Sequence, residues 1–400
     1  MYNTIMKNMF YNRKIYPNIK EHLSNKQITV ITGMRRVGKT TIVNKLLAEI
    51  DSKNKVFFDL QKISNQELFA QKNYDNIILD LRSQGIKTEE KIYLAIDEIQ
   101  LLPEIAGTIK YLYDHYDIKF IVTGSSSYYL KNLFSESLSG RKKIFELYPL
   151  DFGEFLEFKQ VKWAASDFLS TKFSSIEYER LKNFYEEYLE FGGFPEVVLL
   201  STAKEKRDLL SDIISSYLNI DIKNLSDFRD SQNLYNLIKM LAARVGTKLD
   251  YSKLASLSGL SRLTVVNYVN LFEKTYLISR VPVHTKNIDR EIVKARKIYF
   301  NDNGFLNILA DLSGGAKFEN AVFNQLKAEG DLRYYSLKNG REIDFVLNSK
   351  TALEAKENPT DSDLKTLAEL SETAGLPEHR LIGRYQSVKF ADYIWGGEIK

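Results

Sequence analysis

A run of eight residues, GMRRVGKT, constrains this chain more than any other feature of its sequence. It spans residues 33–40 and fits the phosphate-loop pattern GxxxxGK[ST] at every fixed position. The apolar, β-branched run 28–32 precedes it, and apolar residues at helical spacing follow it between residues 41 and 50. This order predicts a strand, a phosphate loop and a helix, and therefore a nucleotide-binding α/β sheet.

The loop residues have the chemistry that ATP and Mg²⁺ require. Glycines at both ends allow backbone amides to turn toward the β-phosphate. We expect the Lys39 ammonium to reach the β and γ oxygens and the Thr40 hydroxyl to bind Mg²⁺. The predicted nucleotide-binding residues are Gly33, Met34, Arg35, Arg36, Val37, Gly38, Lys39, Thr40 and Thr41.

Four later segments predict further parallel strands, at residues 55–60, 91–96, 118–123 and 143–147. The second of these segments ends in Asp97 and Glu98. Because ligands of open α/β sheets bind beyond the carboxyl ends of strands, we expect both acids beside the phosphate loop. Asp97 is predicted to hold Mg²⁺ through water, and Glu98 to polarise the attacking water.

Two features nearby leave alternatives open. The predicted strand 118–123 ends in Thr123, and residues 124–127 follow it. A polar side chain there contacts the γ-phosphate, or it merely caps the next helix. Arg141 follows Ser139 and Gly140. One interpretation is an arginine finger, which acts either on the nucleotide of its own chain or on that of a neighbouring subunit. Action on a neighbour's nucleotide requires a homo-oligomer. The alternative is an ordinary surface arginine.

Five motifs in chain order resemble a prokaryotic AAA+ ATPase family that carries a C-terminal domain of unknown function: ITGMRRVGKTT, LAIDEIQ, FIVTGSSS, SLSGRKKIFELYPLDFGEF and FGGFPEVV. The matches run through roughly the first 200 residues. The resemblance implies a helical lid after the nucleotide domain. It also implies catalytic roles for Lys39, Asp97, Glu98, Arg141 and a polar residue at the strand end, Thr123 or Ser125.

Residues 246–300 form a basic segment, with ten Lys or Arg against four Asp or Glu, a balance of +6 in a chain of net charge +4. Ala255, Gly259 and Val265 have the spacing of a helix-turn-helix, and the following run to Lys297 is predicted to form a wing. The predicted DNA contacts on the second helix are Ser261, Arg262, Thr264 and Asn267. The alternative is a winged helix that binds protein or packs within its own chain.

A second group of acids lies near the C-terminus: Glu319, Asp344, Glu354 and, beside them, Lys356. The segments REIDFVL and ALEAKEN predict two antiparallel strands. Burial of their apolar residues selects the register with Asp344 opposite Glu354, joined by an odd loop such as residues 348–350. Carboxylates that face each other in this way, with Cβ atoms roughly 5 Å apart, can share one Mg²⁺.

This arrangement resembles the PD-(D/E)XK nuclease core over roughly residues 315–390. The resemblance implies Mg²⁺-dependent phosphodiester cleavage by Asp344, Glu354 and Lys356, completed by Glu319. Ile343 stands where the motif's name has proline, and many relatives of this fold have lost activity. The alternative is a charged, solvated face of a half-buried hairpin.

Composition bounds the remaining possibilities. The chain has no cysteine, which excludes disulfides and cysteine-ligated zinc and fits a reducing cytoplasm. No stretch approaches the eighteen or so apolar residues of a membrane helix, and the N-terminus does not resemble a secretory signal. We therefore expect a cytoplasmic protein without a membrane partner.

The sequence as a whole predicts an α/β protein with a P-loop NTPase parallel sheet. The expected domains are an AAA+ core at 1–155, a helical lid at 156–245, a winged helix-turn-helix at 246–300 and a restriction-nuclease-like domain at 301–400. The expected function is a Mg²⁺-dependent ATPase whose turnover controls DNA engagement by the winged helix and the nuclease-like C-terminal domain. The alternatives are a nucleotide-dependent switch or a transcription regulator with an inactive nuclease-like domain.

Overall fold

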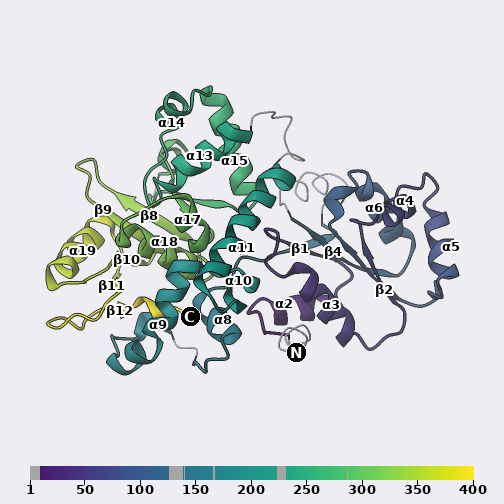
Figure 1. Ribbon diagram of the computed structural model, residues 1–400, viewed down its shortest axis with the longest axis horizontal. Helices are drawn as coiled ribbons and strands as arrows, with labels where there is room; N and C mark the ends of the chain where they lie inside the picture. The colour runs from purple at the N-terminus through teal and green to yellow at the C-terminus, as the bar shows by residue number, and fades with distance from the viewer. Residues whose placement is uncertain (1–9, 126–137, 139, 165–166, 223–230, 286) are drawn as a thin grey trace. The chain divides into compact units, whose positions relative to one another are not determined.

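The structure, a computed structural model, describes residues 10–125, 138, 140–164, 167–222, 231–285 and 287–400. The chain forms two compact units. The first comprises residues up to Tyr148 together with Lys274–Tyr276, and the second comprises Pro149–Glu273 and Leu277–Lys400. Each unit is built on a five-stranded sheet of its own (Figure 1). The finer division of the second unit into three domains stays a prediction.

The sheet of the first unit is wholly parallel, in the order β2-β3-β4-β1-β5. Its strands are β1 (Ile28–Thr32), β2 (Lys55–Asp59), β3 (Ile92–Asp97), β4 (Ile118–Gly124) and β5 (Lys142–Glu146). All five predicted strands are confirmed, with ends that differ by at most one residue. In this order β4 lies between β1 and β3, so the polar end of β4 neighbours both the strand that leads into the phosphate loop and the acids of β3.

Helices of the first unit cover this sheet (Figure 1). They are α2 (Tyr16–Glu21), η2 (His22–Ser24), α3 (Lys39–Glu49), α4 (Ile63–Phe69), α5 (Asp75–Ser83), η3 (Ile99–Leu101) and α6 (Ile105–His115). One continuous apolar core joins the strands to α4, α5 and α6, with Val30 and Leu94 from the sheet and Leu81 and Ile109 from the helices. This buried core holds the carboxyl ends of the strands in fixed register.

The second unit begins with the helices predicted for its N-terminal part. They are α8 (Phe152–Phe158), η4 (Phe168–Ser170), α9 (Ser175–Phe191), α10 (Pro195–Leu199), α11 (Ala203–Ser216), η5 (Tyr217–Ile222) and α13 (Ser231–Ala242). A sharp turn lies between α9 and α10. Gly192 has a φ of 72°, and a Cβ there would lie 2.3 Å from the Asp302 carboxylate, so only glycine fits this close approach.

The basic segment folds into two helices and a strand pair. These elements are α14 (Tyr251–Ser258), α15 (Arg262–Lys274), β6 (Ile278–Val281), α16 (Ile288–Val293) and β7 (Lys297–Phe300). Gly259 ends α14 with a left-handed φ of 68°, and Val265 is fully buried, as the predicted spacing requires. β6 and β7 are antiparallel, with α16 inserted between them. This arrangement is compatible with a winged helix, which stays a prediction.

The C-terminal sheet is mixed, in the order β12-β11-β10-β9-β8. Its elements are α17 (Asn303–Leu309), α18 (Gly314–Leu326), β8 (Leu332–Ser336), β9 (Glu342–Leu347), β10 (Thr351–Lys356), α19 (Asp361–Ala374), β11 (Glu378–Gly383), β12 (Ile394–Trp395) and η6 (Gly396–Glu398). Both α18 and α19 pack on β9 and β10. Five consecutive residues of β9 are buried, so both faces of the strand are covered and the alternative of a solvated face is wrong.

Candidate nucleotide site and C-terminal acid centre

The phosphate loop joins β1 directly to α3, as predicted. A Cβ at Gly33 would lie 2.0 Å from the carbonyl oxygen of Leu147, so this position accepts only glycine. Gly38, with a φ of 99°, is the N-cap of α3. The loop backbone therefore turns in front of a helix N-terminus, which is the arrangement that binds phosphate groups.

Lys39 and Thr40 lie at the start of α3 with well-defined partners. The Lys39 ammonium donates to the carbonyl oxygens of Gly33 and Met34, at 2.9 Å in each case. The Thr40 hydroxyl donates to Asp97 Oδ2 at 2.6 Å. Thr40 and Asp97, the two residues predicted to bind Mg²⁺, are thus in direct contact. Of the other loop residues, Met34 and Val37 are buried, Arg35 is half-buried, and Arg36 and Thr41 are exposed.

A hydrogen-bonded network links the acids of β3 to the end of β4. The Thr123 hydroxyl donates to Asp97 Oδ1 and accepts the backbone amide of Glu98 at 3.2 Å. The Gln100 amide donates to Glu98 Oε2 and to the Ser125 hydroxyl, the latter at 3.0 Å. Thr123 and Ser125 therefore hold the two acids in place. Ser126 and Ser127, from the same predicted strand end, lie outside the described residues.

Sequence reasoning missed two residues of this site. Gln100 is part of the motif LAIDEIQ, and its position two residues after Glu98 was a usable signal. Arg13 donates to the loop carbonyl of Val37 at 2.8 Å and to the carbonyl of Tyr148 at 2.7 Å. Arg13 precedes the loop by 20 residues in a segment without a motif, so only the structure identifies it.

Arg141 is not brought to the phosphate loop of its own chain. Its guanidinium pairs with Asp114 at 3.0 Å, and its side chain is 35% exposed. The carbonyl of Arg141 accepts the amide of Ile28, at the amino end of β1. The phosphate loop follows the opposite end of β1, which is roughly 16 Å away for a strand of five residues. This placement disfavours action in cis. Ser139 lies outside the described residues.

Of the four predicted DNA contacts, Ser261 directly precedes α15, and Arg262, Thr264 and Asn267 lie on its first two turns. Ser261, Arg262 and Asn267 are exposed, and Thr264 is half-buried. The Ser261 hydroxyl accepts the backbone amide of Thr264 at 3.1 Å, so it caps the helix. Two of the four residues therefore have a structural role that the sequence prediction did not include.

The C-terminal strands have the predicted register. β9 and β10 pair with Phe345 opposite Leu353, which sets Asp344 opposite Glu354, and residues 348–350 form the loop. At the Asp344–Glu354 end of this strand pair, backbone amides donate to side-chain carboxylates instead of to backbone carbonyls. Asp344 N–H donates to Glu354 Oε2 at 3.1 Å, and Ala355 N–H donates to Asp344 Oδ2 at 3.2 Å. The two carboxylates thus lie together, as predicted.

Glu319 of α18 and Lys356 of β10 complete the predicted group. Lys356 pairs with Glu354 Oε1 at 2.9 Å. Tyr299 donates to Glu319 Oε1 at 2.7 Å. We define the acid centre as the four carboxylates that gather here: Glu319, Glu342, Asp344 and Glu354.

Two residues here were not predicted, Glu342 and Lys297. The ammonium of Lys297 lies 3.0 Å from Glu342 Oε1, 3.3 Å from Asp344 Oδ1 and 3.6 Å from Glu319 Oε1. Lys297 is only 1% exposed. Lys297 ends the run that is predicted to form a wing, but its side chain is buried among carboxylates.

Burial and charge shift the titration of these groups. Burial raises the pKa of Glu319 and of Glu354, and repulsion from Asp344 adds to both shifts. Burial alone would lower the pKa of Lys297, but attraction to Asp344, Glu319 and Glu342 outweighs it and raises the pKa. The Lys297 ammonium is therefore firmly charged.

The described residues contain neither a group arranged to hold a metal ion nor a helix suited to cross a membrane. Within the described ranges, no group of three or more Asp, Glu or His side chains is arranged to hold a metal ion. No described helix is long and apolar enough to cross a membrane.

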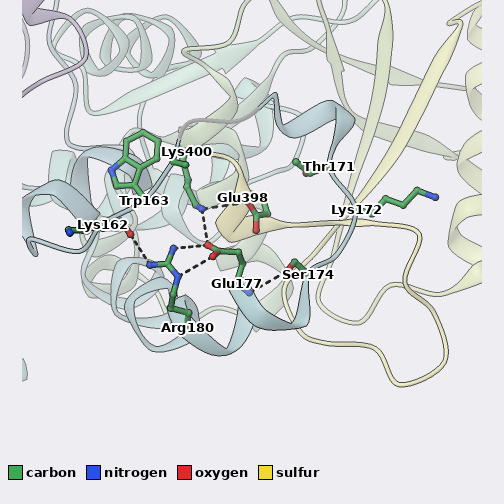
Figure 2. A pocket seen from close by; sticks show the side chains of 10 residues that line it. Lys162, Trp163, Thr171, Lys172, Ser174, Glu177, Arg180, Glu398 and Lys400 are labelled. Atoms are coloured by element: carbon green, nitrogen blue, oxygen red, sulfur yellow. Dashed lines mark hydrogen bonds and ion pairs between the residues drawn. The ribbon is translucent and has the colours of Figure 1, made fainter.

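A pocket of about 580 Å³ lies in the second unit, beside the first turns of α9 (Figure 2). It is lined by basic and acidic side chains that pair with one another. Arg180 lies 2.7 Å from Glu177, and Lys400 lies 3.5 Å from Glu177 and from Glu398. Because Arg180 and Lys400 already pair with acids, these two cations do not indicate an anion site.

Three family models match consecutive parts of the chain. Residues 25–156 match the AAA domain, residues 182–315 match a domain of unknown function, and residues 314–393 match a second domain of unknown function. The match to the first unit, together with its parallel sheet and phosphate loop, identifies that unit as an AAA domain of the P-loop NTPase class. This class binds nucleotides.

Whole-chain relatives carry no functional description. An uncharacterized protein of Methanocaldococcus jannaschii is 28% identical, over 82% of this chain and 74% of its own length. An uncharacterized protein of Haemophilus influenzae is 26% identical, over 84% of this chain and 85% of its own length.

Among solved structures, the ORC1 protein of Aeropyrum pernix in complex with DNA aligns with 76% of this chain and 93% of its own. Its identity is 10% and its TM-score 0.33. The ADP form of the ORC2 protein of the same organism aligns with 67% and 84%, at 13% identity and a TM-score of 0.35. At these TM-scores the likeness supports no statement about function.

Proposed function

We propose that this chain is a Mg²⁺-dependent ATPase whose turnover controls how residues 246–300 engage DNA. One observation carries the ATPase proposal, the 2.6 Å hydrogen bond between Thr40 Oγ1 and Asp97 Oδ2. It joins the hydroxyl of the phosphate loop to the carboxylate at the end of β3. Hard oxygen donors of this kind are the ligands that Mg²⁺ takes beside phosphate groups, so these two residues fit the ion.

The surrounding residues supply the remaining roles in ATP hydrolysis. Lys39 rests on two neutral carbonyl oxygens, which it can exchange for the β- and γ-phosphate oxygens. Glu98 polarises the attacking water, and its carboxylate is oriented by Gln100. Bound Mg²⁺ would neutralise charge on the phosphate oxygens.

Steady-state ATP hydrolysis tests this assignment. Asp97→Asn should lower the rate by about a hundredfold, since it removes a charge that holds Mg²⁺. Asp59→Asn is the matched control, because Asp59 ends the neighbouring strand β2 and pairs in register with Asp97. Wild-type activity in Asp97→Asn would contradict the proposed site.

DNA engagement is supported by exposed positive charge within residues 246–300, on α14, on α15 and before β7. Arg262 lies at its first turn, and Lys253, Lys294 and Arg296 are also exposed. A helix N-terminus with basic neighbours suits contacts to phosphates and base edges. If residues 246–300 bound only protein, no salt-dependent affinity for DNA would be measured.

Arg141 fits a role in trans better than one in cis, because it lies at the amino edge of its own sheet. A homo-oligomer would then complete the site. Mixing Lys39→Ala with Arg141→Ala, each inactive alone, should restore ATPase activity if Arg141 acts on a neighbour's nucleotide. Arg141→Ala with full activity would identify an ordinary surface arginine.

We also propose that the C-terminal region acts as a nuclease-like recognition domain without cleavage activity. The acids have the expected order and register. Lys297, however, pairs with two of them, Glu319 and Asp344, and with the neighbouring Glu342, which favours the inactive alternative over phosphodiester cleavage.

A further inference from the structure

Lys297 is the first residue of β7, and its backbone is fixed on both sides. β7 pairs with β6, where Lys297 lies opposite Val281, and an isolated bridge joins Lys297 to Lys248. The amide of the next residue, Ile298, donates to the carbonyl of Thr247 at 3.1 Å. Lys297 therefore belongs to the basic segment by its backbone, while its side chain enters the acid centre.

The surroundings of this ammonium are closed and negative. Three carboxylate oxygens lie within 3.0 to 3.6 Å of its nitrogen, and the Tyr334 ring centroid lies 5.9 Å away. The Glu319 carboxylate is held in turn by Tyr299 and lies against Gly246, where a Cβ would be 2.9 Å from Glu319 Oε1. The acids are therefore packed around the lysine.

We propose that the Lys297 ammonium is the resident cation of the acid centre and closes the centre to divalent metal ions. Mg²⁺ binds carboxylate oxygens at roughly 2.1 Å and loses its hydration shell reluctantly. An ammonium already supplies the positive charge, and it is covalently attached and pre-positioned. Lys297 already contacts one oxygen each of Glu319, Glu342 and Asp344, so a metal ion that binds these oxygens must displace it.

The chemical consequence follows from the kind of cation. An ammonium neutralises carboxylates and donates hydrogen bonds, but it has no open coordination position for a water nucleophile. The acid centre therefore joins β7 to β9 and α18 by ion pairs. This inference does not depend on ATP hydrolysis by the first unit.

Mn²⁺ binding to the nucleotide-free full chain tests the proposal, measured as loss of the electron paramagnetic resonance signal of free Mn²⁺. Lys297→Met should bind Mn²⁺ at least about tenfold more tightly than the wild type, because the carboxylates lose their cation. Lys297→Met/Asp344→Asn should lose this gain. Lys248→Met is the matched control, since Lys248 pairs with the same Glu342 at 2.9 Å from a partly exposed position and leaves Lys297 in place.

Two results would overturn the proposal. One is Mn²⁺ binding by the wild type that Asp344→Asn abolishes, and the other is a folded Lys297→Met that binds no more tightly than Lys248→Met. If circular dichroism shows that Lys297→Met does not fold, Lys297→Met/Glu319→Gln is measured against the same criteria, because it buries one carboxylate fewer. The comparison of Mn²⁺ binding by the wild type and by Asp344→Asn decides the question even if both variants that carry Lys297→Met fail to fold. An Mn²⁺ affinity of the wild type that Asp344→Asn does not change supports the closed centre.

Discussion

The two units each contain a buried lysine whose ammonium contacts a different kind of oxygen. These residues are Lys39 in the first unit and Lys297 in the second. Lys39 is 5% exposed and rests on two backbone carbonyls, both at 2.9 Å. Lys297 is 1% exposed and rests on three carboxylates. A lysine that donates to carbonyl oxygens can exchange them for phosphate oxygens, whereas the Lys297 ammonium is held in three ion pairs. Proximity of a lysine to acids therefore does not by itself indicate a catalytic site.

The largest effect on stability is expected at Lys297. Lys297→Met should lower the free energy of unfolding by about 3–5 kcal/mol, because it leaves buried carboxylates without their cation. Lys248→Met, which breaks a more exposed pair with the same Glu342, should cost less than about 1 kcal/mol. Urea unfolding of the two variants measures the difference. Equal losses would mean that burial does not distinguish these pairs.

Asp302 is also a buried acid, but backbone amides donate to its carboxylate, whereas an ammonium contacts the acids around Lys297. It accepts Gly193 N–H at 2.7 Å and Phe305 N–H at 3.0 Å, and burial raises its pKa to about 6. A pKa raised above the unfolded value of 3.8 means that the folded state holds the proton to higher pH. This contribution to stability is complete below about pH 4 and is lost as the pH rises through about 6, with an upper size of about 3 kcal/mol.

Asp302→Asn keeps the helix cap and removes the titrating group. The slope of the urea midpoint against pH between about 4 and 6 should therefore become flatter than in the wild type. Asp250→Asn changes a similar cap at the exposed start of α14 and serves as the control. An unchanged slope in Asp302→Asn would show that Asp302 titrates normally.

Gln100 tests whether the network of the first unit positions its acid. Gln100→Ala should lower kcat for ATP by about tenfold with KM nearly unchanged, because Glu98 loses the amide that orients it. Gln71→Ala, which removes a hydrogen bond to Asp80 on α5, is the control. A change in KM without a change in kcat would assign Gln100 to nucleotide binding.

The smallest expected effect concerns the exposed cations, which contrast with the buried Lys297. Arg262→Ala should weaken DNA binding and reduce the slope of log affinity against log salt by about 1. Lys204→Ala, an exposed lysine of α11, should leave the slope unchanged. Fluorescence anisotropy over a salt series measures both. An unchanged slope in Arg262→Ala would remove Arg262 from the DNA contacts.

Local pattern was sufficient to predict much of this molecule. The eight-residue loop and the apolar runs predicted the parallel sheet and the positions of Lys39, Thr40 and Asp97. Apolar alternation in two short strands selected the register of Asp344 and Glu354, although both faces of β9 proved to be covered. In each case the deciding residues are close in sequence or belong to neighbouring strands.

The contacts that decide function depend on packing between distant segments. Lys297 meets Asp344 across 47 residues, and Arg13 meets Val37 across 24. Arg141 was correctly placed before the last strand, but the pairing with Asp114 and the distance from the phosphate loop depend on the strand register. Composition counts the charges of residues 246–300 without showing that Lys297 is buried.

The most direct test of the central claim is the rate of Mg²⁺-dependent ATP hydrolysis by Lys39→Ala and Lys55→Ala. Both lysines lie in the first unit and donate to two backbone carbonyls, those of Leu47 and Ile50 in the case of Lys55. We predict that Lys39→Ala loses about a hundredfold to a thousandfold in rate and that Lys55→Ala stays within about twofold of the wild type. Wild-type activity in Lys39→Ala, or equal losses in both variants, would contradict the assignment of the phosphate loop as the ATPase site.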